Sequence, residues 1–343
     1  MANFDTSAYA KAQSQLINVY KDAEMRTIEP VVLRMILSTT GIMLPDYKAL
    51  KKSVARPIEG NFLTRTSRAL GTGGPIHNHS GSQGVSAIQS FTWSAFDDKT
   101  VTTLKEANNS IFTLEQTSAN KVQNVSLNFA EDLEARASAF LTANRTQVNI
   151  ATVEGTFNAT NDAFEITEST NGNRAIQITK SVMKLNKYAK FEHVVVCDTV
   201  SFNKFEFDAA QGAQNSTNLS FQYQGVTFLH DINLSAAAAA IDATYVKGFW
   251  EVVPRGSVSA LPWLPIQNVT GVVTPESMYG NVFDPLTTLN IGTHSYWTRI
   301  DGTSLGGNTQ DNSLETQYFV YVAFNTVPLT TATESSIFAF ALI

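Results

Sequence analysis

The sequence predicts an α+β protein with a long two-stranded arm, and three observations lead to this prediction. Helical spacing of apolar residues is clearest from Asn128 to about Val148. Strand patterns dominate from about Ser295 onward, where YFVYVAFNTVPL is apolar on both faces, as a central strand requires. The stretch from Arg56 to Thr100 is extended in character, and a two-stranded ribbon of this kind is marginal in water without support from another surface.

The composition indicates a globular chain whose surface is poor in charge. Of the 343 residues, 43% are hydrophobic but only 16% are charged, where soluble domains usually carry about a quarter. The deficit favours a surface that is partly covered by assembly, although a secreted β-rich protein shows the same polarity. The net charge of -6 argues against a general nucleic-acid binder.

The sequence also indicates in which cellular compartment the protein is made. The N-terminal residues lack a basic stretch followed by an apolar one, so we expect no signal peptide. No apolar run approaches the roughly eighteen residues of a membrane span, so we expect no membrane contact. The single cysteine, Cys197, lies in an apolar run and is typical of a buried residue in a reducing compartment. We therefore expect a protein made in a cytoplasm.

The first fifty residues contain too little apolar surface to form a core. Residues 8 to 28 place apolar side chains on one helical face, and Pro30 opens a second apolar segment that Gly41 closes. We expect an arm that packs on something else. The residues of the first helical face are Ala12, Leu16, Val19, Tyr20 and Ala23.

The segment from Arg56 to Thr100 is predicted to form two strands that are joined by a loop. Its second half alternates apolar and polar residues through Phe91 and Trp93, and residues 71 to 84 hold five glycines and a proline. Support from a neighbouring subunit is one interpretation, and an ordinary flexible insertion is the other. The basic run around this segment suits a solvated or intersubunit face, with loose phosphate contact as the alternative: Lys48, Lys51, Lys52, Arg56, Arg65 and Arg68.

The long helix is expected to begin with a capping box made by Asn128 and Glu131. Carboxylates at Glu131, Asp132 and Glu134 would then favour the dipole of the first turn. The predicted buried stripe comprises Ala130, Leu133, Ala137, Phe140 and Leu141. Such a helix can be the spine of a flat domain.

From about residue 174 to 280 helices and strands are expected to alternate in a compact mixed domain. A helix near its start places Lys180, Lys184 and Lys187 opposite an apolar face, which suits a solvated or intersubunit surface. FEHVVVCD predicts a buried strand, SFNKFEFDAA a short helix and LSFQYQGVTFLHD two strands that turn at Gly225, and the alanine run predicts a further helix that leads to a strand. The apolar C-terminal IFAFALI must be covered by the fold or by a partner.

The best lead for chemistry is the pair His77 and His79, which with Gln83 approaches the first metal-binding motif of the cupin family. Glutamine is a poor ligand at the carboxylate position and no second half follows, so we expect a polar loop tip. His193 precedes Cys197 on one strand, but nothing there lowers the pKa of the thiol, so a core cysteine is expected. No other nucleophile, phosphate-loop or metal motif is present. We predict no enzyme, and no catalytic, cofactor-binding or metal site.

The order of these parts resembles the major capsid protein of tailed bacteriophages, the Hong Kong 97-type fold. The resemblance extends over nearly the whole chain, and FEHVVVCD, GFWEVVPRGSVSALPW and YFVYVAFNTVPL look like a strand, a helix-to-strand joint and a late strand of such proteins. It implies an N-terminal arm (1–54), an extended β-loop (55–105), a peripheral domain with the spine helix (106–173), a mixed α/β axial domain (174–280) and C-terminal strands of the peripheral domain (281–343).

The resemblance implies a structural protein that forms hexamers and pentamers in an icosahedral shell around double-stranded DNA. Further implied partners are scaffolding, portal and decoration proteins, and packaged DNA by weak nonspecific contact. The implied place is the virion capsid, assembled in the cytoplasm of a bacterial host. Two departures are notable: there is no long N-terminal helical region to serve as a fused scaffold, and no lysine lies between Lys52 and Lys99. An encapsulin-like cargo compartment, another virion structural protein and a cupin-like metalloprotein are the alternatives.

Overall fold

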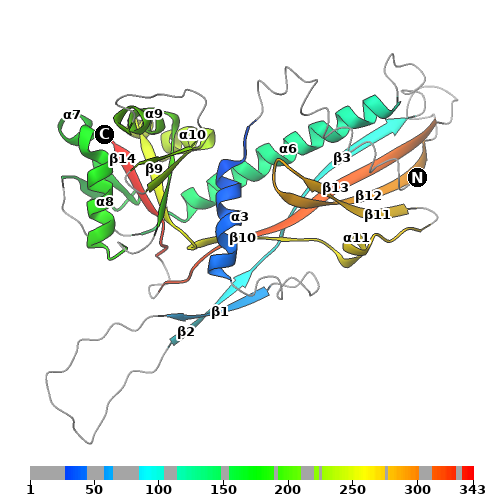
Figure 1. Ribbon diagram of the computed structural model, residues 1–343, viewed down its shortest axis with the longest axis horizontal. Coiled ribbons are helices and arrows are strands. Elements are labelled where there is room, and N and C mark those ends of the chain that lie inside the picture. Colours follow the sequence, from blue (N-terminus) through cyan, green and yellow to red (C-terminus); the bar gives the residue numbers. More distant parts are fainter. Residues whose placement is uncertain are drawn as a thin grey trace, which may run out of the picture.

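The computed structural model describes residues 28–44, 58–64, 85–103, 114–147, 154–188, 192–209, 220–223, 226–274, 277–300, 311–329 and 334–343. These residues form an elongated body of two β-sheets, from which a two-stranded ribbon projects (Figure 1). Two predicted segments lie outside the described residues. They are the glycine-rich tip over residues 71 to 84 and the N-terminal helix over residues 8 to 28, of which only Ile28 is described.

The five-stranded sheet is antiparallel and is built around one long strand, β13. The strand β3 pairs with one edge of β13, and β12 and then β10 pair with the other, while β11 pairs with the outer edge of β12. The prediction that YFVYVAFNTVPL is a central strand is therefore confirmed, because partner strands pair with both edges of β13. The strands are β3 (Ser94–Thr103), β10 (Val258–Trp263), β11 (Ser277–Asp284), β12 (Leu289–Ile300) and β13 (Asp311–Thr326).

The seven-stranded sheet is mixed and has the order β4-β5-β14-β9-β6-β8-β7. The C-terminal strand β14 lies inside it, parallel to β5 and antiparallel to β9, so the fold itself covers the apolar C-terminus. The strands are β4 (Thr156–Asn158), β5 (Ala163–Ile166), β6 (His193–Cys197), β7 (Ser220–Tyr223), β8 (Val226–His230), β9 (Phe249–Pro254) and β14 (Phe338–Leu342).

Helices cover both faces of this sheet. One face packs against α8 (Ala175–Leu185) and α9 (Thr199–Ala209) through an aromatic core centred on Trp250 and Phe340. The other packs against α10 (Ile232–Ile241), the 3-10 helix η2 (Ala243–Lys247) and the end of α6. Short elements complete this part: α7 (Glu168–Asn171) and η1 (Gly172–Arg174).

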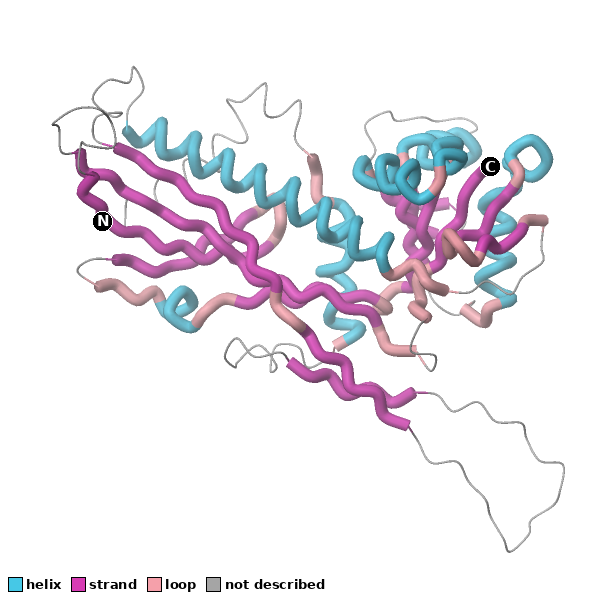
Figure 2. The backbone as a smooth tube through the Cα atoms, turned by 180° about the vertical axis from the view of Figure 1, so that it is seen from behind, coloured by secondary structure: helices cyan, strands magenta, loops and turns pink. Residues whose placement is uncertain are grey.

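The helix α6 (Leu114–Ala143) joins the two sheets. Its 30 residues give a rod of about 45 Å that lies along the five-stranded sheet and ends beside the seven-stranded one (Figures 1 and 2). The expected start at Asn128 is wrong by about four turns. Asn128 lies within the helix, and its side-chain amide donates to Asp98 of β3 (2.9 Å) instead of capping. The helix also ends at Ala143, not at Val148.

The helix α3 (Val31–Met43) crosses β10 and packs against α6 in the same core. The hydroxyl of Thr40 accepts the backbone N–H of Ala260 (3.0 Å), which ties the helix to the strand. Gly41 lies inside this helix, two residues before its end, and so does not close it.

The sheets cut across the segments expected from the sequence. Residues 156–166 and 338–342, expected in the peripheral domain, belong to the seven-stranded sheet, whereas β10 and the first half of β11, expected in the axial domain, belong to the five-stranded one. The chain crosses between the sheets several times, so each sheet draws strands from distant parts of the sequence. The expected divisions near residues 54 and 105 fall outside the described residues.

Candidate assembly interface

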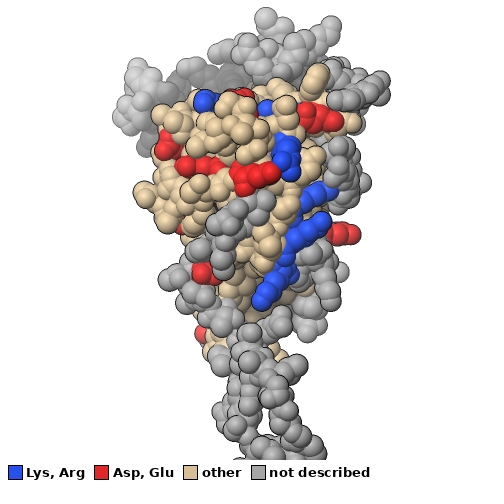
Figure 3. All heavy atoms as spheres, turned by 90° about the vertical axis from the view of Figure 1, so that its left-hand side faces the viewer, with Lys and Arg blue, Asp and Glu red and all other residues tan. Residues whose placement is uncertain are grey.

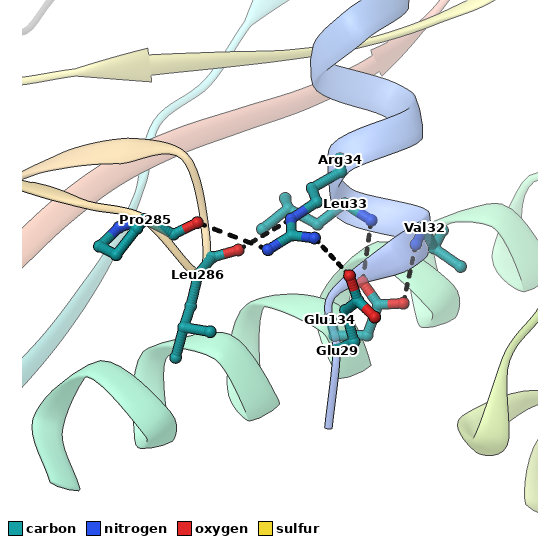
Figure 4. Close-up of polar contacts among 7 residues, drawn as sticks. All are labelled: Glu29, Val32, Leu33, Arg34, Glu134, Pro285 and Leu286. Atoms are coloured by element: carbon teal, nitrogen blue, oxygen red, sulfur yellow. Dashed lines mark hydrogen bonds and ion pairs between the residues drawn. The ribbon is translucent and has the colours of Figure 1, made fainter. Parts of the chain in front are cut away.

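A buried carboxylate connects α6 to the start of α3. Figure 4 shows the Glu134 carboxylate of α6 accepting the backbone N–H groups of Val32 and Leu33, both at 2.8 Å. The residue before α3 provides no side-chain cap, so a carboxylate from another helix takes that role. Burial raises the pKa of Glu134 to about 7 despite these bonds, which act in the opposite direction.

Arg34 extends this joint to the turn between β11 and β12. Its Nε atom donates to the carbonyl of Leu286 (3.0 Å), and its guanidinium lies 2.6 Å from the Glu29 carboxylate (Figure 4). Glu134, predicted to favour the dipole of its own helix, instead lies buried in the middle of α6 and serves α3. These hydrogen bonds tie α3 to the spine helix and to the five-stranded sheet, and the three together are called the platform below.

The arm grows out of this platform. The strands β1 (Ile58–Thr64) and β2 (Val85–Phe91) pair as an antiparallel ribbon. At its base Phe91 is fully buried, and the amide of Asn325 on β13 accepts from the Gln89 side chain (2.6 Å) and donates to the carbonyl of Ser90 (3.0 Å). These contacts fix where the arm leaves the body.

Beyond this base the ribbon has apolar side chains in solvent. Leu63 is 86% exposed and Ile88 is 63% exposed. The ribbon projects away from both sheets (Figures 1 and 2). Two isolated strands with exposed apolar residues are marginal in water, so this geometry suits a ribbon that packs against a second molecule.

A second apolar surface surrounds α11 (Ile266–Thr270) at the edge of the five-stranded sheet. From Gly256 to Pro275 the sequence contains no Asp, Glu, Lys or Arg. Asn268 anchors the segment: it is fully buried, and its side-chain amide donates to the carbonyls of Gly280 and Thr293, both at 2.9 Å. The exposed aliphatic side chains here are Ile266, Val269, Val272 and Val273.

Beside α11 an open groove of about 300 Å³ runs over the sheet. Its floor includes Phe319 and Tyr321 of β13 and the stacked rings of Tyr279 and His294, whose centroids are 4.3 Å apart. Asp97 of β3 brings a carboxylate to the same groove. This surface was not predicted from the sequence, although the charge-free stretch was a signal that could have located it.

The end of the molecule formed by the seven-stranded sheet carries both basic and exposed apolar side chains. Figure 3 shows a row of basic side chains on this end. Lys180 and Lys184 lie on α8, as predicted, whereas Lys187 follows the helix in a left-handed backbone conformation (φ 68°). The helix α10, on the opposite face of this sheet, carries no charged residue. Exposed apolar side chains occur in this part of the molecule at Val200, Phe207, Ile232 and Val246.

The candidate chemical residues are not brought together by the described part of the fold. Cys197 is fully buried, and burial raises the pKa of its thiol well above the usual value, which confirms the prediction of a core cysteine. His193 lies at the other end of the same strand, and burial lowers the pKa of its imidazole. The residues His77, His79 and Gln83 lie outside the described residues.

Within the described ranges no three His, Cys, Asp or Glu side chains are arranged to hold a metal ion. Among those same residues, no helix has the length and apolar character to cross a membrane.

No protein-family model and no curated protein sequence matches this chain. Solved structures do match. The capsid asymmetric unit of cyanophage A-1(L) is similar over 95% of this chain and 96% of that one, with 10% identity and a TM-score of 0.52. The capsid asymmetric unit of cyanophage Pam1 is similar over 86% of this chain and 87% of that one, with 11% identity and a TM-score of 0.50. The chain therefore has the α+β fold of phage capsid subunits, and the fold prediction is confirmed.

Proposed function

We propose that this protein is a major capsid protein that assembles into an icosahedral shell enclosing double-stranded DNA. The observation that carries the proposal is the match to a phage capsid subunit over nearly the full length of both chains. A fold alone does not fix a function, so the surfaces matter. The unsupported ribbon and the charge-free edges described above are features that a free monomer would have to expose to water.

The mechanism is mechanical. Flat subunits associate as hexamers and pentamers, the seven-stranded parts meet through their basic and apolar surfaces, and the arms reach neighbouring copies. Each contact is weak, but symmetry repeats it many times and closes the shell. The two sheets, held by α6 and α3, give each copy the stiffness that regular repetition needs.

The other members of the assembly follow from the same proposal. Scaffolding, portal and decoration proteins are its expected protein partners, and packaged DNA contacts the shell weakly and without sequence preference. The mature protein belongs to the virion capsid after assembly in the cytoplasm of the host bacterium. The proposal assigns it no enzymatic activity.

Electron microscopy and light scattering of the purified protein test the proposal. The wild type is expected to form closed particles of megadalton mass. The double variant L63S and I88S removes apolar area from the arm and should leave a folded subunit, by circular dichroism, with at least tenfold fewer particles. The matched control, L63M with I88V, keeps the apolar area and should assemble normally. A wild type that stays a stable monodisperse monomer under all conditions would refute the proposal.

A further inference from the structure

Three buried carboxyl groups from three different elements meet where α6 reaches the seven-stranded sheet. Glu134 of α6 is 2% exposed, Asp231 between β8 and α10 is 2% exposed, and Glu251 of β9 is fully buried. Glu134, Ser138 and Thr142 are spaced four residues apart on α6 and so lie on one face of that helix. The Ser138 hydroxyl hydrogen-bonds Asp231 and the Thr142 hydroxyl approaches Glu251, which brings the three carboxyl groups to that face. None of the three has a role in the surfaces described above, apart from the bonds of Glu134 to α3.

The donors around this cluster are unevenly shared. Glu134 accepts two backbone N–H groups of α3, and Asp231 accepts the N–H of Asn233 at the start of α10 (2.9 Å) and is hydrogen-bonded by Ser138 of α6. Glu251 is the exception. No donor in the described part of the chain makes a hydrogen bond of good geometry to either of its oxygens.

The positive charge facing the cluster is small. Arg145, just after α6, and the Thr142 hydroxyl approach Glu251 and lower its pKa. His230 of β8 faces Asp231, but burial lowers the pKa of its imidazole, which favours the neutral ring at neutral pH. Asp198, after β6, adds a further carboxyl next to His230. One guanidinium therefore faces more carboxyl groups than it can neutralise, so ionising them all in this closed space is costly.

The position of the cluster gives it mechanical importance. The helix α6 packs against β3 and β13 of one sheet along most of its length, and against α10 beside the other sheet near its end. The same apolar core continues through both contacts and includes Leu133 and Ala137 of α6 and Leu234 and Ala238 of α10. A change in charge at this point acts directly on the contact that joins the two halves of the subunit.

We propose that this carboxyl cluster is a proton-dependent joint: protonated, it keeps α6 packed on the seven-stranded sheet, and loss of its protons in mildly alkaline solution loosens that contact. The inference concerns a single chain and does not depend on the proposed function. In a shell it would make the angle between the two halves of each subunit responsive to pH.

The direction of the effect follows from the pKa shifts. Burial raises the pKa of Glu251 from 4.5 to about 8 and that of Glu134 from 4.5 to about 7. At a pH between the unfolded and the folded pKa, the packed state binds more protons than the open state. The contribution of these carboxyl groups to the stability of the packed state is therefore fully present below about pH 4.5, and it is lost as the pH rises toward 8. One such proton changes the opening equilibrium by about tenfold per pH unit.

Hydrogen exchange of the whole protein, corrected for the intrinsic pH dependence of exchange, tests the joint. In the wild type the amides of β9 and of the last turns of α6 should lose protection by about tenfold per pH unit between pH 6 and pH 8. The variant Glu251→Gln is neutral at every pH and should show a clearly smaller loss. The control Glu192→Gln changes an exposed carboxylate paired with Arg255 (2.5 Å) and should retain the wild-type response.

Two results would overturn the proposal: a Glu251→Gln variant with the full wild-type pH response, or a wild type whose β9 protection does not change with pH. If the variant fails to fold, infrared spectroscopy of the wild type decides. A band from a protonated carboxyl group should be present at pH 6 and absent at pH 9. A spectrum without that band at pH 6 would also exclude the joint.

Discussion

At the scale of single residues, Asp284 shows how a buried charge can be fully satisfied. It is completely buried at the end of β11, where its carboxylate accepts from the Ser126 hydroxyl of α6 (2.5 Å) and the Thr287 hydroxyl (2.6 Å). It also accepts the backbone N–H groups of Leu286 (3.3 Å) and Thr287 (3.1 Å). One side chain therefore shapes the β11–β12 turn and fastens it to the spine helix.

We predict that Asp284→Ala lowers the free energy of unfolding of the subunit by about 3 kcal/mol, because several buried donors lose their acceptor at once. Chemical denaturation of dissociated subunits measures this change. Asp132→Ala is the control, since Asp132 is exposed on α6 and only 3.9 Å from Arg136, and it should change stability by less than about 0.5 kcal/mol. Equal effects of the two variants would contradict this account.

The same scale shows what sequence patterns cannot provide. Carboxylates at Glu131, Asp132 and Glu134 look alike in the sequence, yet the first two are exposed and Glu134 is buried against α3. The difference depends on which face of α6 meets a helix about a hundred residues away. No local spacing contains that information, so the cap on α3 could not have been predicted.

At the scale of elements, strong local periodicity was predictive and weak periodicity was not. The strands β6, β8 and β9 and the helices α8, α9 and α10 lie where the sequence placed them. The three strands have dense apolar runs and α8 has an apolar face, whereas α10 was predicted from its run of alanines. The first turns of α6 were missed because residues 114 to 127 are rich in polar side chains, and the Asn128 and Glu131 pair imitates a cap. The short β4 and β5 were missed for a related reason: they lie in a polar stretch and obtain their stability from the neighbouring β14.

The segment around α11 leads to a second prediction. Asn268 holds this helix on β11 and β12 by donating to two backbone carbonyls. The side chain of an aspartate has no N–H group to donate, and its carboxylate would face those two carbonyl oxygens in a buried position. Asn268→Asp should therefore destabilise the subunit by about 3 kcal/mol and expose α11 to limited proteolysis.

The control for this variant is Gln267→Glu, which makes the same change of charge at an exposed neighbouring position. It should leave the proteolysis pattern and the melting temperature unchanged. If both variants behave alike, the added charge and not the lost hydrogen bonds would explain the effect, and the anchoring role of Asn268 would be rejected.

At the scale of the whole molecule, the order of the parts was more informative than any motif. An arm, a spine helix and two sheet regions in sequence predicted the fold, even though strand membership crossed the expected segment boundaries. The exposed surfaces were harder to locate, because exposure depends on how distant segments pack. The charge-free stretch from Gly256 to Pro275 becomes meaningful only once the structure places α11 at the edge of a sheet.

The chemistry of the arm leads to a last prediction, about how the proposed shells are held together. In some capsid proteins of the Hong Kong 97-type fold, which the sequence resembles, a lysine of the extended loop forms an isopeptide bond with an asparagine of a neighbouring subunit. Here no lysine lies between Lys52 and Lys99, and the arginines at positions 56, 65 and 68 stay protonated and are not nucleophiles. Lys99 itself is on β3 in the body of the protein and not on the ribbon.

We therefore predict that mature particles are held only by noncovalent contacts. Boiled particles should give one band near the chain mass of 37.4 kDa on a denaturing gel. Because guanidinium contacts with acidic groups are screened by salt, particles should also dissociate more readily at about 1 M salt than at 0.1 M. Treatment with a chemical crosslinker supplies the positive control, since it should turn the single band into a ladder. A ladder from untreated particles would show covalent joining and would contradict the prediction.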